Sequence, residues 1–166
     1  MRIVIDSREQ NPFTFEGKDC EVVTGALPTG DYSLAGLTDV IAIERKSLSD
    51  LVGCLTGDNR ERFERELARG RALDYFAVVI ESGFTELTAK QYRSGMNPHA
   101  AAQSILAFQV RYRTPFFWAG SRKAAEYVTF SLLSKFLREA HNRYKAITEA
   151  HTRPEAGQEP RATRAA

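Results

Sequence analysis

Cysteine is scarce in this chain of 166 residues, and its scarcity excludes two classes of protein. The two cysteines, Cys20 and Cys54, form no C-x-x-C pair and have no histidine pair near them. Neither a disulfide scaffold nor a zinc site is therefore indicated, and a reducing compartment is the simpler interpretation. We expect an intracellular protein, located in the cytoplasm or nucleoid, or in the nucleus if the source is eukaryotic.

Long apolar runs are also missing. No run approaches the roughly 18 residues that are needed to span a bilayer. The apolar start at residues 3–5 gives way to Asp6, which makes it too short for a signal peptide. We therefore expect no membrane partner.

A strong charge of either sign is the third absence. The 23 Lys and Arg against 21 Asp and Glu leave a formal net charge of only +2. The overall field of such a protein is weak, so a nucleic-acid site would have to come from local patterning. Composition alone identifies no partner.

The chain does contain enough apolar residues, 43%, for one ordinary globular domain. Short β-branched or aromatic runs predict strands at residues 3–5, 21–23, 31–34, 40–43, 76–80 and 114–118. Helical spacing and capping residues predict helices at about 48–55 and 60–73, from Pro98, and from Ser121 to about Tyr144. This order predicts an α/β domain with a central mixed sheet flanked by helices, over residues 1–146. Residues 147–166 contain almost nothing to bury and are predicted to form a disordered tail.

Acidic and basic residues gather where the predicted strands end. If residues 32–34 and 40–43 pair as a hairpin, Glu44 returns close to Asp31. Two facing carboxylates are typical ligands of Mg²⁺, and Asp6 at the end of the first strand could add a third. Lys46 lies two residues beyond Glu44 and points to the same face, where its ammonium group could orient water or stabilise charge at phosphorus.

A structural interpretation of the same residues is the commoner one for this spacing alone. Asp31 could cap a turn, and Glu44 and Lys46 could form a solvated pair. Asp50 could serve as the acidic N3 residue of a helix capped by Ser47. Short acidic spacings therefore do not decide between structure and chemistry.

A longer set of motifs is far more specific. It consists of Asp6-Ser7-Arg8-Glu9, Gly30-Asp31-Tyr32, Ile43-Glu44-Arg45-Lys46-Ser47 with Asp50, and Arg62-Phe63. From about Arg2 to His141 the chain resembles the nuclease domain of the XPF-type structure-specific endonucleases, whose hallmark is G-D-x(n)-E-R-K-x(3)-D. The resemblance implies a restriction-endonuclease-like core of the PD-(D/E)xK superfamily.

The resemblance also implies a chemistry and a role for each matching residue. It implies hydrolysis of DNA phosphodiester bonds with Mg²⁺ or Mn²⁺, at flaps, forks or junctions, in DNA repair or recombination, with no small-molecule cofactor. By the resemblance, Asp31 and Glu44 are metal ligands and Lys46 is the catalytic lysine. The resemblance places Asp6, Arg8 and Glu9 at the edge of the active site, with Arg45, Asp50 and Arg62 as supporting positions. From the residues themselves, we expect Asp6 to be a third metal ligand and Glu9 to assist catalysis. We also expect Arg8, Arg45 and Arg62 to bind DNA.

Two alternatives remain open at this point. The family usually carries a helix-hairpin-helix domain after the nuclease domain, and these 166 residues contain none. The chain could therefore be a nuclease subunit that is active only with a DNA-binding partner, or a non-catalytic DNA-binding or dimerisation module. The last helix has a wide apolar face, so we expect a homodimer or a partner subunit that contacts residues 98–137.

Overall fold

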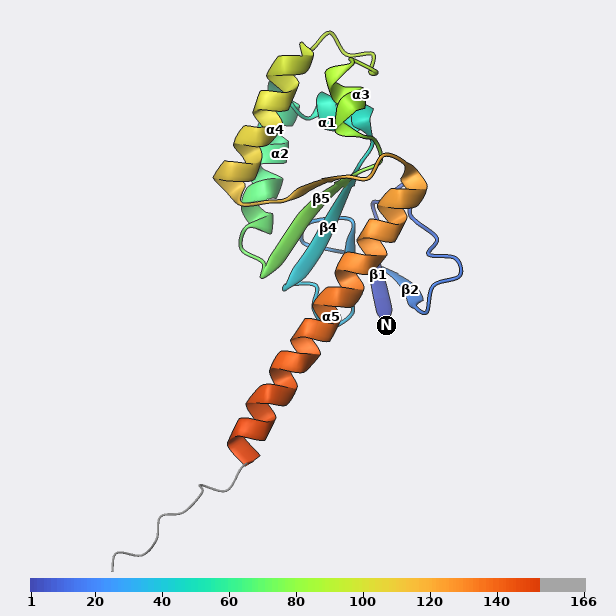
Figure 1. The fold of residues 1–166 in the computed structure, drawn as a ribbon, viewed down its shortest axis with the longest axis vertical. Helices are drawn as coiled ribbons and strands as arrows, with labels where there is room; N and C mark the ends of the chain where they lie inside the picture. Colours follow the sequence, from blue (N-terminus) through green and yellow to red (C-terminus); the bar gives the residue numbers. More distant parts are fainter. Residues whose placement is uncertain (153–166) are drawn as a thin grey trace, which may run out of the picture.

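Six strands form a single mixed sheet in the computed structural model, which describes residues 1–152 (Figure 1). The strands are β1 (Arg2–Asp6), β2 (Glu21–Gly25), β3 (Tyr32–Leu34), β4 (Ile41–Lys46), β5 (Tyr75–Ile80) and β6 (Phe116–Trp118). Their order across the sheet is β2-β1-β3-β4-β5-β6. β3 is antiparallel to both of its neighbours, β1 and β4, and all other neighbouring pairs are parallel. The predicted α/β class with a mixed sheet is confirmed.

The helices cover both faces of this sheet. They are α1 (Leu48–Gly53), α2 (Gly57–Gly70), α3 (Phe84–Thr88), α4 (Pro98–Tyr112) and α5 (Arg122–Thr152). One apolar cluster joins α1, α2 and α4 to one face, and a second joins α5 to the other. The sequence patterns missed α3, which has only five residues.

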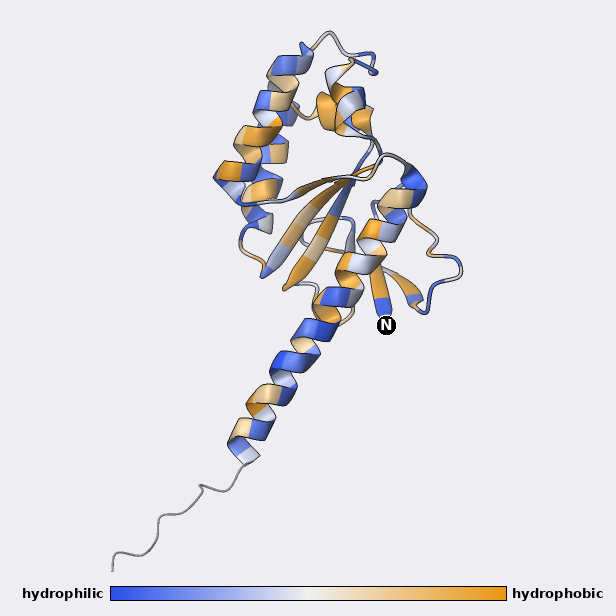
Figure 2. Ribbon diagram, viewed as in Figure 1, coloured by the Kyte–Doolittle hydropathy of each residue, from blue (hydrophilic) through white to orange (hydrophobic). Residues whose placement is uncertain are grey.

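β4 and β5 lie in the centre of the sheet and have apolar residues on both faces. Phe76, Val78 and Ile80 pack on the side of α2 and α4, while Ala77 and Val79 pack toward α5. Because both faces are covered, β5 is an unbroken apolar run (Figure 2). The same alternation in β4 places the side chain of Ile43 on the α5 side of the sheet and that of Ala42 on the α2 side. The charged residues 44–46 at the end of β4 continue this alternation.

α5 continues beyond its predicted end. It runs to Thr152, so the first six residues of the predicted tail, 147–152, are helical, and residues 153–166 of that tail lie outside the described part of the chain. Leu133 is its last buried residue, and the helix then extends away from the sheet (Figure 1). Within residues 1–152, no helix has the length and apolar character needed to cross a membrane.

Candidate active site

The hairpin of β3 and β4 brings Asp31 and Glu44 to the same edge of the sheet. Tyr32 pairs with Ile43, and the Asp31 amide donates to the Ile43 carbonyl oxygen at 2.9 Å. Gly30 approaches β4 so closely, at a φ of +76°, that a Cβ atom there would lie 2.8 Å from the Cβ of Ala42. The glycine before Asp31 is therefore required by the backbone, because any side chain would push the hairpin apart.

Alternation along β4 separates the three charged residues at its end. Glu44 and Lys46 point toward α2, and the Lys46 ammonium group forms an ion pair with the Glu44 carboxylate. The same ammonium group lies 4.0 Å from a carboxylate oxygen of Glu66 and 5.4 Å from the centre of the Phe63 ring. Arg45 points to the opposite face. Sequence spacing thus predicts correctly that Glu44 and Lys46 share one face.

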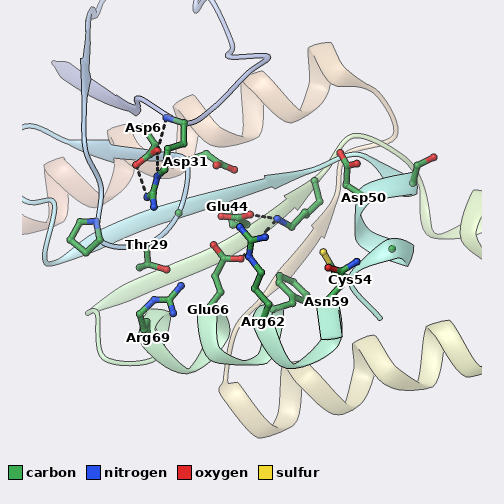
Figure 3. Close-up of a pocket in the computed structure, with 17 residues that line it drawn as sticks. Asp6, Thr29, Asp31, Glu44, Asp50, Cys54, Asn59, Arg62, Glu66 and Arg69 are labelled. Carbon is green, nitrogen blue, oxygen red and sulfur yellow. Dashed lines mark hydrogen bonds and ion pairs between the residues drawn. The ribbon is translucent and has the colours of Figure 1, made fainter. Parts of the chain in front are cut away.

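The two carboxylates and the lysine line a cleft of about 520 Å³ between the edge of the sheet and α2 (Figure 3). Asp31, Glu44 and Lys46 come from the sheet side of this cleft. α2 contributes Arg62, Glu66 and Arg69, which are spaced i, i+4 and i+7 and so share one face of the helix. The cleft therefore has acidic groups in its interior and two arginines on one wall.

Burial raises the proton affinity of both sheet carboxylates. It raises the pKa of Asp31 to about 6. It also raises the pKa of Glu44 well above its ordinary value, and the nearby Asp31 and Glu66 carboxylates add to this effect. Burial alone would lower the pKa of Lys46, but the negative charges of Glu44 and Glu66 outweigh it and raise that pKa. A second positive charge beside Asp31 and Glu44 would therefore be bound favourably.

The chemistry of this donor set fits a hard divalent cation. Asp31 and Glu44 offer carboxylate oxygens, which Mg²⁺ and Mn²⁺ prefer. The Arg45 amide donates to Asp31 Oδ2 at 2.7 Å, which orients the carboxylate and leaves Oδ1 for another ligand. Within residues 1–152 no three Asp, Glu, His or Cys side chains form a metal cluster. Water and phosphate oxygens would have to supply the remaining ligands, as is usual for Mg²⁺.

Asp6, the third implied ligand, is already bound by other groups. Its Oδ1 accepts hydrogen bonds from the amide and Nε of Arg8, at 2.8 and 2.7 Å. Its Oδ2 accepts from Arg8 Nη2 and from the Leu27 amide, at 2.9 and 2.7 Å. The Arg8 hydrogen bonds lower the pKa of Asp6 to about 2. Asp6 lines the cleft, but both of its carboxylate oxygens accept hydrogen bonds, from Arg8 and from Leu27 in the segment after β2. Its role as a metal ligand stays a prediction.

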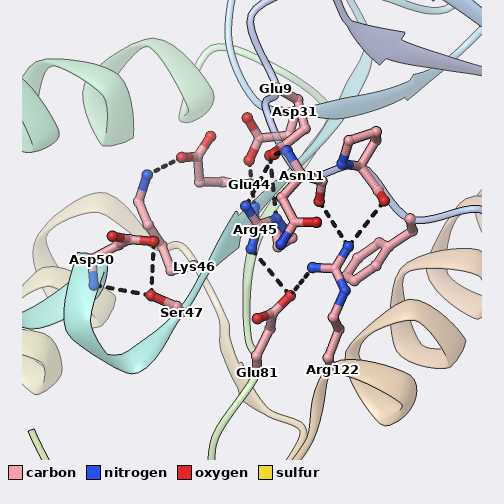
Figure 4. A network of polar contacts seen from close by, with 12 residues as sticks. Glu9, Asn11, Asp31, Glu44, Arg45, Lys46, Ser47, Asp50, Glu81 and Arg122 are labelled. Atoms are coloured by element: carbon pink, nitrogen blue, oxygen red, sulfur yellow. Dashed lines mark hydrogen bonds and ion pairs between the residues drawn. The ribbon is translucent and has the colours of Figure 1, made fainter.

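Arg45 and Glu9 are brought together, but neither lines the cleft. The Arg45 guanidinium, in a side chain that is only 10% exposed, donates to Glu9 at 3.0 Å and to Glu81 at 3.1 Å (Figure 4). Glu81 also pairs with Arg122, whose Nη2 donates to the carbonyl oxygens of Asn11 and Pro12. This network joins the end of β4 to the loop after β1 and to the start of α5. Glu9 is near enough to Asp31 for its charge to add to the raised pKa of that carboxylate. The DNA-binding role of Arg45 and the catalytic role of Glu9 stay predictions.

The remaining motif residues have separate positions. Asp50 caps α1 together with Ser47, because its amide donates to Ser47 Oγ and its carboxylate accepts from that hydroxyl. Arg62 lines the cleft, as does Arg8, whose side chain is 72% exposed. Sequence reasoning missed Glu66 and Thr29, which also line the cleft. Helical spacing from Arg62 could have found Glu66, whereas no sequence signal marks Thr29.

Comparisons with known proteins identify this arrangement. A mixed sheet with carboxylates and a lysine at the end of a central strand defines a restriction-endonuclease-like domain, the class that the motifs imply. Residues 5–132 match the ERCC4 domain, and the chain therefore belongs to the ERCC4 domain family of nuclease domains.

Two solved structures share the fold. The chain is 22% identical to XPF from Aeropyrum pernix, with a TM-score of 0.67 over 87% of this chain and 69% of that one. A structure of XPF from Aeropyrum pernix in complex with DNA matches at 22% identity and a TM-score of 0.64, over 83% of this chain and 66% of that one. The comparison with curated proteins gives no significant match.

Proposed function

We propose that this protein is a divalent-metal-dependent endonuclease that hydrolyses phosphodiester bonds in DNA at flaps, forks or junctions. The observation that carries the proposal is the meeting of Asp31, Glu44 and Lys46 in one cleft at the end of β4. Membership of the ERCC4 domain family and the resemblance of the fold to a DNA-bound XPF support it. An intracellular location stays a prediction.

Each residue of the cleft would contribute in a different way. Asp31 and Glu44 would hold Mg²⁺, which supplies charge for the phosphate oxygens and lowers the pKa of a bound water. With its charge retained, Lys46 donates hydrogen bonds rather than accepting a proton, so it would orient the attacking water and stabilise negative charge at phosphorus. Arg62 would bind the phosphate from the α2 side.

We also propose that the protein works with a second subunit, either a copy of itself or a DNA-binding partner. Exposed apolar side chains on α4 and α5 support this, since Leu106 and Val110 lie on the first helix and Tyr127 and Leu137 on the second. These residues fall within the predicted interface, residues 98–137. Sedimentation equilibrium with and without DNA would test the proposal: a monomer under both conditions, with full cleavage activity, would contradict it.

The test of the enzyme function is cleavage of labelled flap, fork, junction and linear duplex DNA. We expect cleavage with Mg²⁺ or Mn²⁺ and none with EDTA. Glu44→Gln and Lys46→Met would each lower the rate by roughly 10²-fold or more, because each removes a charge beside the reacting phosphate. Glu61→Gln, which changes an exposed carboxylate on α2, is the matched control and would leave the rate unchanged.

The outcomes separate the proposal from its alternative. Equal cleavage by the wild type, Glu44→Gln and Lys46→Met, or cleavage that persists in EDTA, would contradict a metal-dependent active site in this cleft. Tight DNA binding without cleavage by any form would instead favour a non-catalytic DNA-binding module.

A further inference from the structure

The hydroxyl group of Thr29 is a buried polar group without a partner. The residue is 4% exposed, and within residues 1–152 its Oγ1 forms no hydrogen bond. Thr129 is the other described residue with an orphaned side-chain oxygen, but it lies on α5 and does not line the cleft. Thr29 lines the cleft two residues before Asp31, and its oxygen points toward the side of Glu66 in Figure 3. An unpaired buried hydroxyl destabilises the folded protein. A ligand bound in the cleft could supply the missing hydrogen bond.

Arg69 lines the same end of the cleft from the α2 wall and forms no ion pair among residues 1–152. Two other arginines on α2 are paired, since Arg60 contacts Glu64 and Arg65 contacts Glu61, whereas Arg62, like Arg69, forms no ion pair among residues 1–152. The guanidinium group of Arg69 and the free hydroxyl of Thr29 thus line one cleft, and Figure 3 draws both at the same end of it.

We propose that Thr29 and Arg69 form a binding subsite for the DNA phosphate next to the scissile one. This inference rests on the proposed function, which assigns the scissile phosphate to Asp31, Glu44 and Lys46. The Thr29 hydroxyl donates a hydrogen bond to a non-bridging oxygen, and the Arg69 guanidinium pairs with the same phosphate. The subsite fixes the position of the strand relative to the metal ligands without reading its sequence.

Charge explains why an anion, and not a cation, is bound at this end of the cleft. Asp31 and Glu44 attract a cation beside Lys46, while Arg62 and Arg69 lie on the opposite wall, where the negative charge of Glu66 between them faces the Lys46 ammonium group at 4.0 Å. A hydroxyl donor beside a guanidinium group matches a phosphate, whose oxygens only accept hydrogen bonds. A bound phosphate would therefore satisfy both free groups at once.

The first test measures DNA binding in Ca²⁺, on duplexes that carry one uncharged methylphosphonate at either phosphate flanking the cleavage position. For the wild type, we expect one of the two replacements to weaken binding about tenfold. Arg69→Gln would weaken binding to unmodified DNA by a similar factor and would abolish the effect of that replacement. It would also lower the slope of log K against log salt by about 0.7 to 0.9.

Arg71→Gln is the matched control, because Arg71 is an exposed arginine at the same end of α2 that does not line the cleft. We expect Arg71→Gln to keep the full methylphosphonate effect. If Arg69→Gln also keeps it, or if neither replacement weakens wild-type binding, the subsite is contradicted.

The second test uses Thr29→Val, which removes the hydroxyl and keeps the shape. Without DNA it would raise the Tm by about 2 to 4 °C, because an unsatisfied polar group is lost. It would weaken binding in Ca²⁺ several-fold, and Thr29→Ser would restore it. A lower Tm with unchanged binding would show instead that the hydroxyl holds an internal water, and would overturn the assignment.

Failure of this inference is distinguishable from failure of the proposed function. Metal-dependent cleavage that is sensitive to Glu44→Gln, together with wild-type behaviour of the Thr29 and Arg69 variants, would remove only the subsite. Loss of the subsite effects together with cleavage in EDTA would contradict both the subsite and the proposed function.

Discussion

Asp31→Asn is expected to make the metal-free protein more stable at pH 8, although it removes a metal ligand. Burial raises the pKa of Asp31 from its ordinary 3.8 to about 6, so the ionised carboxylate is disfavoured in the folded state. The two values correspond to about 3 kcal/mol of lost stability once pH exceeds both. Asparagine keeps an oxygen that can accept the Arg45 amide, so the replacement relieves this cost without breaking the hairpin.

The sign of the pH dependence follows from the raised pKa. Stability that depends on protonated Asp31 is fully present below about pH 4 and is lost as pH rises through about 6. In EDTA the wild type is therefore expected to lose stability between pH 5 and pH 8. The advantage of Asp31→Asn, about 3 kcal/mol at pH 8, falls to about half of that at pH 5.

Urea unfolding in EDTA at the two pH values measures this effect, with Asp39→Asn, an exposed carboxylate, as the control expected within about 0.5 kcal/mol of the wild type. Adding Mg²⁺ at pH 8 would stabilise the wild type and leave Asp31→Asn unchanged. A variant that is less stable than the wild type at pH 8 in EDTA, with an unchanged m-value, would refute the reasoning.

Three other substitutions probe the fold around the site. Arg45→Met would lower the free energy of unfolding by about 3 to 5 kcal/mol in urea, because it leaves the buried Glu9 carboxylate without an ion-pair partner and leaves Glu81 with Arg122 alone; a loss below 1 kcal/mol would contradict that role. Gly70→Ala would cost about 1 to 3 kcal/mol, because its Cβ would lie 2.3 Å from the Phe76 ring, whereas Gly53→Ala has open space around it and would not show this clash. Asp6 has a lowered pKa, so its stabilising effect would disappear as pH falls from about 4 through about 2, and an acid titration of Asp6→Asn would lack that transition.

The sheet and most helices could be predicted because their signals are local. Each strand is a short apolar run bounded by polar or turn residues, and Asn97-Pro98 marks the start of α4 as predicted. The end of α5 could not be predicted from burial, because after Leu133 the helix has no buried residue. Its Ala, Arg, Glu and Lys residues favour helix without any packing, and composition alone does not separate such a helix from a tail.

Only those parts of the candidate site that follow from local chain geometry could be predicted from the sequence. Hairpin return and strand alternation bring together Asp31, Glu44 and Lys46, and both can be read from the sequence. The same alternation turns Arg45 away, but its partners Glu9 and Glu81 follow from the three-dimensional arrangement of segments that are distant in the chain. Glu66 belongs to the cleft only because α2 packs on this face of the sheet.

The metal site can be located directly in crystals soaked in Mn²⁺ and measured near the manganese absorption edge. If Asp31 and Glu44 hold the metal, one anomalous peak is bound by carboxylate oxygens of both residues, and no peak is present there in crystals of Glu44→Gln. A peak at another site, or none between these carboxylates at a Mn²⁺ concentration that supports cleavage, would contradict this metal site.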